Sequence, residues 1–107
     1  MKLVIIESPY KGNVEENIEY AKQCMLDSIK RGECPFASHL LYTQVLDDSN
    51  ADERSSGIAL GMEVTKRADL VAIYTDNGVT QGMDLGLRFA KENNIKFEYR
   101  TLNDKDK

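Results

Sequence analysis

The sequence has little of several residue types that support particular kinds of site. Its 107 residues include no tryptophan, one histidine, two prolines and two cysteines. Cys24 and Cys34 show neither a CxxC spacing nor a cysteine and histidine spacing, so the pattern supports neither a zinc site nor a disulfide framework. We expect two reduced thiols that pack as small hydrophobic side chains, and no metal.

Long apolar runs and basic clusters are also missing. No window approaches the roughly 18 apolar residues that span a membrane, and the chain begins without a signal-peptide pattern. The 14 Lys and Arg residues are scattered against 18 Asp and Glu, for a net charge of −4, whereas nucleic-acid affinity comes largely from clustered cations. We therefore expect a cytoplasmic protein that binds neither a membrane nor a nucleic-acid polymer.

The length limits the architecture to one domain. A chain of 107 residues with 41% hydrophobic residues can bury a core without disulfides or metals. An active site in a cleft between two domains is excluded. We expect one domain over residues 1–102 and a disordered, charged tail at 103–107.

Short aliphatic runs alternate with segments of helical spacing. Strands are predicted at residues 2–6, 34–38, 69–74 and 95–99, the second and fourth being edge-like. Helices are predicted from the caps Asn13, Asn50 and Thr80 to about residues 31, 67 and 94. Residues 39–50 have no clean period and predict a long loop with room for one helical turn, and loops of this length are usually functional.

This alternation predicts an α/β fold in which helices cover both faces of a parallel sheet. We expect a single flavodoxin-like, three-layer domain with about four strands in the order 2-1-3-4. In such sheets ligands bind beyond the carboxyl ends of the strands. The loops after the strands at 2–6 and 69–74 are therefore the candidate site.

The loop after the first strand carries a hydroxyl, a cation and a glycine just before a helix N-terminus. These features suit an anion cradle, and the residues are Ser8, Tyr10, Lys11, Gly12 and Asn13. Pro9 and Gly12 are also ordinary turn residues, so a simple turn is the alternative.

The loop after the third strand carries two carboxylates, Asp76 and Asp84, with Gly82 and Gly86 on either side of Asp84. The helix dipole keeps a carboxylate in a first turn ionised, which suits a nucleophile or an electrostatic anchor. Compensation of the dipole at Asp84 and an ordinary turn at Asp76 are the alternatives.

The middle loop contributes the only histidine, His39, at the ligand-facing end of the second strand. It also contributes Tyr42, Asp47 and Asp48, and the following helix carries Arg54. Arg54 can clamp a phosphate or pair with these acids. A structural histidine and a solvated acidic surface are the alternatives.

Three segments together resemble the nucleoside 2-deoxyribosyltransferase superfamily: residues 8–13 (SPYKGN), 68–74 (ADLVAIY) and 78–86 (GVTQGMDLG). The chain is similar to the 2'-deoxynucleoside 5'-phosphate N-hydrolases of that superfamily and to short bacterial and phage members. The resemblance covers residues 2 to about 102.

The resemblance implies N-glycosidic chemistry through a carboxylate. The family nucleophile is a glutamate in a Gly-x-Glu-x-Gly segment, and Asp84 takes its place here. Asp84 would attack C1' of the sugar, Asp76 would protonate or hold the leaving base, and Tyr10 would orient Asp84. No metal or organic cofactor is implied.

The ligand implied is a small nucleoside or nucleotide. The expected binding residues come from the three loops and the helix N-termini: Ser8, Pro9, Tyr10, Gly12, Asn13, His39, Asp48, Arg54, Asp76, Gly78, Gly82 and Met83.

Three departures from the family pattern favour an alternative function. Asp84 is one methylene shorter than glutamate, an aliphatic residue replaces a tyrosine of the first strand, and Glu7 replaces a small residue. The alternative is a non-catalytic module that sequesters a nucleotide-derived or signalling ligand. A purely structural interaction domain is a third hypothesis.

A second copy of the chain is the expected partner. Pockets commonly bury 70 to 90% of a small ligand, and the end of a four-stranded sheet is small and open. We therefore expect a homo-oligomer, a dimer or higher, most simply a two-fold dimer through the second or third predicted helix.

Overall fold

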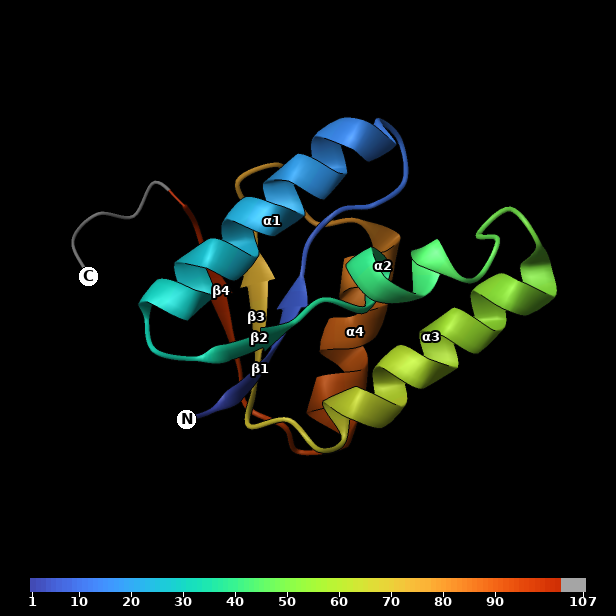
Figure 1. Ribbon diagram of the computed structural model, residues 1–107. Helices are drawn as coiled ribbons and strands as arrows, with labels where there is room; N and C mark the ends of the chain where they lie inside the picture. Colours follow the sequence, from blue (N-terminus) through green and yellow to red (C-terminus); the bar gives the residue numbers. More distant parts are fainter. Residues whose placement is uncertain (103–107) are drawn as a thin grey trace.

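The computed structural model describes residues 1–102, and its strands and helices alternate along the chain (Figure 1). The strands are β1 (Leu3–Glu7), β2 (Cys34–Phe36), β3 (Leu70–Tyr74) and β4 (Phe97–Arg100). The helices are α1 (Val14–Lys30), α2 (Ser38–Leu41), α3 (Ala51–Thr65) and α4 (Gln81–Glu92), with a short 3-10 helix, η1 (Tyr42–Gln44), after α2. The tail predicted at 103–107 lies outside the described residues.

The four strands form one parallel sheet in the order β2-β1-β3-β4. Ile5 of β1 lies opposite Phe36 of β2 and Val71 of β3, which fixes the register at the centre of the sheet. Every residue of β3 is buried, as expected for an inner strand of a sheet covered on both faces. The α/β fold class and the strand order predicted from the sequence are confirmed.

Side chains alternate across β1 and divide the core into two layers. Val4 and Ile6 pack with Tyr20 and Cys24 of α1 on one face. Ile5 packs on the other face with residues of β3 and α4, including Met83 and Leu87. Because α1 contributes to one layer and α4 to the other, helices cover both faces of the sheet.

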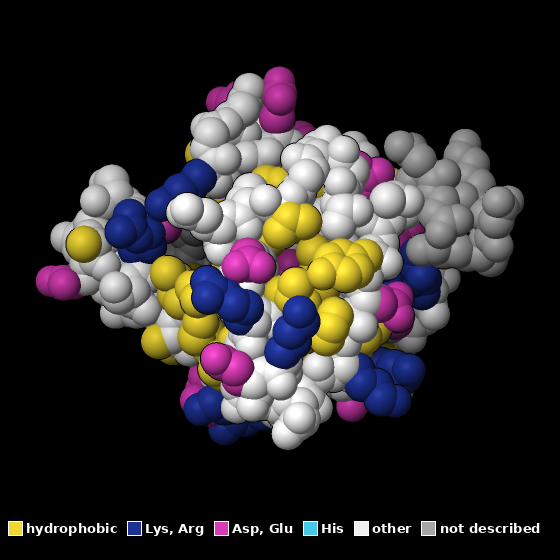
Figure 2. Space-filling model, turned by 180° about the vertical axis from the view of Figure 1, so that it is seen from behind, with side chains coloured by type: hydrophobic (Ala, Val, Ile, Leu, Met, Phe, Trp, Pro, Cys, Tyr) yellow, Lys and Arg dark blue, Asp and Glu magenta, His cyan; other side chains and the backbone are white. Residues whose placement is uncertain are grey.

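Seen from behind, the surface of the molecule presents hydrophobic side chains interspersed with Lys, Arg and acidic side chains (Figure 2).

Three predicted N-caps are confirmed, and they set where the helices begin. The Asn13 side chain accepts a hydrogen bond from the Glu16 backbone N–H, and the Asn50 side chain accepts from the N–H groups of Asp52 and Glu53. The Thr80 hydroxyl accepts from the N–H of Met83. These caps satisfy backbone donors that would otherwise be unpaired, and they fix the point at which the loops after β1 and β3 enter α1 and α4.

The long loop predicted at 39–50 is more regular than expected. Helix α2 and η1 occupy its first half, and the Thr43 hydroxyl donates to the backbone oxygen of His39 across this turn. Helix α3 approaches α2 closely at Gly61, because a Cβ there would lie 3.0 Å from Ser38 Oγ. The first residue of α2 is therefore in direct contact with the second half of α3.

A polar network lies under the end of β4. The Arg100 side chain is only 2% exposed and donates two hydrogen bonds to the Glu33 carboxylate, at 2.7 and 2.8 Å. It also donates to Glu98 and to the Tyr74 hydroxyl, which in turn donates to Asp27. The contacts with Glu33 join β4 to the residue just before β2. These two strands form the opposite edges of the sheet.

Three further features concern membrane spans, metal-binding groups and cysteines. Within residues 1–102, no helix has both the length and the apolar character needed to cross a membrane. In the same range, no group of three or more His, Cys, Asp or Glu side chains could hold a metal ion. Cys24 is buried, Cys34 is exposed, and both are free thiols.

Candidate functional site

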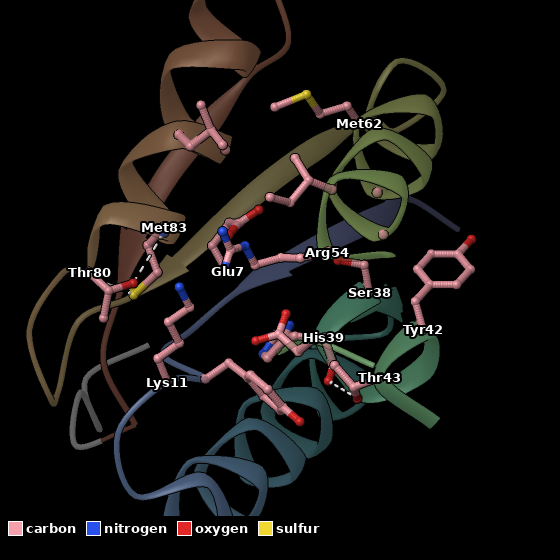
Figure 3. Close-up of a pocket in the computed structure, with 18 of the residues that line it drawn as sticks. Glu7, Lys11, Ser38, His39, Tyr42, Thr43, Arg54, Met62, Thr80 and Met83 are labelled. Carbon is pink, nitrogen blue, oxygen red and sulfur yellow. Dashed lines mark hydrogen bonds between the residues drawn. The ribbon is translucent and has the colours of Figure 1, made fainter. Parts of the chain in front are cut away.

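A cavity of about 410 Å³ opens beyond the carboxyl end of β1 (Figure 3). The loop after β1, helix α2 with η1, helix α3 and the first turns of α4 surround it. Its apolar wall comes from α3, α4 and the segment between η1 and α3: Leu46, Ile58, Met62, Leu85 and Phe89. The cavity thus lies at the end of the sheet where the sequence predicted ligand binding.

Glu7 is the last residue of β1, and its carboxyl group lines the cavity (Figure 3). No hydrogen bond or ion pair joins this carboxyl group to another described residue. Burial raises its pKa from 4.5 to about 8, because a low-dielectric surrounding disfavours the charged form. At neutral pH Glu7 is therefore mostly protonated and can donate a hydrogen bond.

His39 and Ser8 form a hydrogen-bonded pair beside Glu7. The distance between His39 Nε2 and Ser8 Oγ is 2.7 Å, and the Tyr10 ring meets the His39 ring edge-on. Burial lowers the pKa of His39 from 6.5 to about 4. The imidazole is therefore neutral at physiological pH and presents hydrogen-bonding capacity without charge.

Two cations reach into the cavity, Lys11 from the loop after β1 and Arg54 from α3 (Figure 3). Neither forms an ion pair within 4.0 Å of a carboxylate in the described part of the chain. Asp48 and Glu53 also line the cavity, and Glu53 accepts a hydrogen bond from the backbone N–H of Asp47. The cavity therefore has two cationic groups available to an anionic ligand.

The structure brings together about half of the binding residues predicted from the sequence. The predicted residues that line the cavity are Ser8, Tyr10, His39, Asp48, Arg54, Gly82 and Met83. The predicted residues that lie outside its lining are Pro9, Gly12, Asn13, Asp76, Gly78 and Asp84.

Asp84, the predicted nucleophile, lines a neighbouring surface depression with Val79 and Arg88, which adjoins the main cavity at Thr80, Gln81 and Leu85. Its carboxylate lies 3.2 Å from Arg88 Nε, and its side chain is 50% exposed. Tyr10, predicted to orient it, lines the main cavity. The carboxyl group of the cavity closest to the sheet is that of Glu7, at the end of β1.

Asp76, predicted to contact the base, forms hydrogen bonds with α1 and with the segment that follows β4. Its carboxylate accepts a hydrogen bond from the Tyr20 hydroxyl and another from the Leu102 backbone N–H, while its own N–H donates to Tyr20. These bonds join the loop after β3 to α1 and to the segment after β4, on the opposite face from the cavity.

We expect Asp76→Ala to lower the free energy of unfolding by about 3 kcal/mol, since it removes the charged group that accepts from the Tyr20 hydroxyl and the Leu102 N–H. Urea denaturation measures this loss. Asp84→Ala is the matched control, because among the described residues Asp84 pairs only with the exposed Arg88, and such pairs contribute about 0 to 1 kcal/mol. Equal losses in the two variants would contradict a structural role for Asp76.

Sequence reasoning missed Glu7 and Gly86 as partners in one site. The available signal for Glu7 was an acidic residue directly after four aliphatic positions of a buried strand. The last residue of such a strand lies at the carboxyl edge of the sheet, where ligands bind. The contact with Gly86 depends on how α4 lies against β1, which no local pattern specifies.

The sequence was compared with known proteins and with protein families. No curated protein matches the sequence. A family model described as a domain of unknown function, DUF7768, matches residues 2–100, which include all four strands and every residue that lines the cavity. The chain therefore belongs to the DUF7768 family.

Proposed function

We propose that this protein binds a nucleotide in the cavity at the end of β1 and cleaves its N-glycosidic bond with Glu7 as the reacting carboxyl group. One observation carries the proposal: within residues 1–102, a carboxyl group without a hydrogen-bond or ion-pair partner lies in an apolar-walled cavity that also holds two cations without an ion-pair partner. The resemblance of the loops to nucleoside 2-deoxyribosyltransferases supports the nucleotide ligand and N-glycosidic chemistry, but it places the nucleophile at Asp84; the choice of Glu7 rests on the cavity alone.

The cavity suits the base and the phosphate of a nucleotide. Its volume of about 410 Å³ falls in the usual range for small-molecule sites. The apolar wall of Ile58 and Met62 from α3 and Leu85 and Phe89 from α4 can receive a flat base. Lys11 and Arg54 supply charge-assisted hydrogen bonds to a phosphate.

The reaction then follows the retaining glycosidase scheme. The ionised Glu7 carboxylate bonds to C1' while the C1'–N bond breaks, and the base leaves with the bonding electron pair and takes a proton from water. A second water hydrolyses the glycosyl ester, which frees the sugar phosphate and regenerates Glu7. Because the pKa of Glu7 is about 8, the rate should rise about tenfold per pH unit below that value.

A second candidate function is binding without cleavage. The pKa of Glu7, raised to about 8 by burial, favours it, since the protonated carboxyl group is a hydrogen-bond donor and not a nucleophile at neutral pH. Under this proposal Glu7 donates to an acceptor atom of the ligand, which is released intact.

The test combines binding and base release. The protein is titrated calorimetrically with each deoxynucleoside 5'-monophosphate and with the matching nucleoside, and released base is measured by chromatography at pH 6 to 9. Base release that increases with pH supports cleavage. Binding with full recovery of the nucleotide supports the second candidate. No binding of any nucleotide would overturn both proposals.

Charge removal at the cavity gives a more specific prediction. We expect Lys11→Gln and Arg54→Gln each to weaken binding of the monophosphate by about tenfold to a hundredfold, the value of one charge-assisted hydrogen bond, with little change for the nucleoside. Lys22→Gln is the matched control, because Lys22 is exposed on α1 and pairs with Glu19. Equal losses for nucleoside and nucleotide would exclude a phosphate role for these cations.

A further inference from the structure

The Glu7 carboxyl group lies in the space that a side chain at position 86 would occupy. A Cβ atom built on Gly86 would be 2.7 Å from Glu7 Cδ and 3.1 Å from Oε1, with Oε2 nearer still. Real Cβ atoms essentially never approach another heavy atom within 3.0 Å. Glu7 and any residue larger than glycine at position 86 therefore compete for one volume.

The backbone gives no other reason for glycine at this position. Gly86 lies inside α4, where glycine destabilises a helix relative to alanine. It does not have the positive φ that Gly12 and Gly78 have. Gly82 in the same helix provides a contrast, because a Cβ there would meet only Thr80 Oγ1, at an ordinary 3.9 Å. Contact with Glu7 is thus what distinguishes Gly86.

We propose that Gly86 is a positioning residue: the volume left by its missing side chain seats the Glu7 carboxyl group against α4 and holds it in the cavity. The chemical part of this inference rests on the proposed function. A carboxyl group displaced by about 1 Å loses on the order of a hundredfold in rate, so the glycine would set the geometry of the reacting group.

The shared volume has a reciprocal consequence. A carboxyl group can reach the same place from α4 when β1 no longer supplies it. In the double variant Glu7→Ala with Gly86→Asp, the new Cβ takes the space vacated by Glu7, and the aspartate carboxyl group begins about 1.5 Å beyond it. The exchange moves the carboxyl group from the strand to the helix within one cavity.

The first experiment does not depend on any activity. The pKa of Glu7 is measured by carboxyl-carbon NMR titration in the wild type, in Gly86→Ala and in Gly82→Ala, the control for adding a methyl group to this helix. We expect Gly86→Ala to lower the Glu7 pKa by at least one unit, because the displaced group is pushed toward cavity water, and Gly82→Ala to leave it within a few tenths. An unchanged pKa in Gly86→Ala would overturn the inference.

Thermal unfolding provides a second measurement should Gly86→Ala fold poorly. We expect Gly86→Ala to raise the melting temperature of Glu7→Ala by more than it changes that of the wild type, because in Glu7→Ala no side chain has to move aside and only the gain in helix propensity remains. A substitution effect of the same sign and size in both backgrounds would overturn the inference.

Activity adds the functional part. We expect Gly86→Ala to lower base release about a hundredfold, and the Glu7→Ala, Gly86→Asp exchange to exceed Glu7→Ala alone by at least about tenfold. If the wild type releases no base, the cleavage proposal fails, while the pKa and melting results still decide the role of Gly86. Base release by the wild type that Gly86→Ala leaves unchanged would overturn the positioning role alone.

Discussion

Replacing Glu7 by glutamine should lower base release by about a thousandfold or more and leave the dissociation constant for the nucleotide within about threefold. Glutamine has nearly the shape of glutamate, so it fits the volume beside Gly86. It has no carboxylate to bond to C1', and loss of such a reacting group costs orders of magnitude in turnover. Single-turnover base release and calorimetry on the same sample separate the two effects.

Asp84→Asn discriminates between the two carboxylates. The sequence assigns the nucleophile to Asp84, whereas the cavity holds Glu7. If Glu7 reacts, Asp84→Asn loses only the exposed contact with Arg88, and turnover stays within a few fold. A large loss in Asp84→Asn together with an active Glu7→Gln would show that the reacting carboxylate is Asp84 and that the cavity serves another purpose.

Glu7→Gln should also change how stability depends on pH. The folded pKa of Glu7 is raised to about 8 from an ordinary 4.5, so between these values the folded state binds more protons than the unfolded state. Stability must therefore fall as pH rises, by about 1.5 kcal/mol between pH 6.5 and pH 8. Glu7→Gln should abolish this fall, and urea denaturation at several pH values measures it.

His39 opposes Glu7 in the acidic range. Its pKa is lowered from 6.5 to about 4, so between these values the unfolded state binds more protons, and stability rises with pH. The two slopes cancel over much of the range from pH 4.5 to 6.5. The comparison of Glu7→Gln with the wild type is therefore clearest above pH 6.5, and parallel curves there would contradict the raised pKa of Glu7.

Arg100→Leu should cause the largest loss of stability, about 3 to 5 kcal/mol. Removing one partner of a buried ion pair leaves the other charge uncompensated. Here that charge is Glu33, whose carboxylate is 14% exposed and whose pKa the hydrogen bonds from Arg100 hold below the usual range. A domain of this size has only about 5 to 15 kcal/mol of total stability, so the variant should unfold at a much lower urea concentration.

Arg67→Leu is the matched control for Arg100→Leu. Arg67 forms an ion pair with Glu63 on the surface of the chain, with side chains 69% and 52% exposed. Exposed pairs of this kind contribute about 0 to 1 kcal/mol. If Arg100→Leu were no more destabilising than Arg67→Leu, the network under β4 would not stabilise the fold.

The fold was predictable because local patterns and topology agree. Aliphatic runs marked β1 and β3, and the caps Asn13, Asn50 and Thr80 marked where three helices begin. The alternation of elements left few possible strand orders. The Arg100 network was not predictable, because its main partner, Glu33, lies 67 residues away, and sequence spacing carries no information about such a contact.

The position of the cavity was predictable, but which carboxyl group lines it was not. The carboxyl-end rule pointed to the loops after β1 and β3, and Ser8, His39 and Arg54 do line the cavity. Which acidic group enters depends on the rotation of α4 about its axis. Packing of Met83 and Leu87 into the core sets that rotation, which turns Gly86 toward Glu7 of β1 and leaves Asp84 outside the lining of the cavity.

Helix α3 determines how firmly the cavity wall is held. Of its 15 residues only Thr65, at its last position, is buried, and contacts such as that of Gly61 with Ser38 hold the rest to the protein. Few buried contacts mean a low free energy of local opening, so amide hydrogens in the first turns of α3 should exchange faster than those of β3. A ligand that engages Arg54 would then order this helix, and part of its binding energy would be used for that ordering.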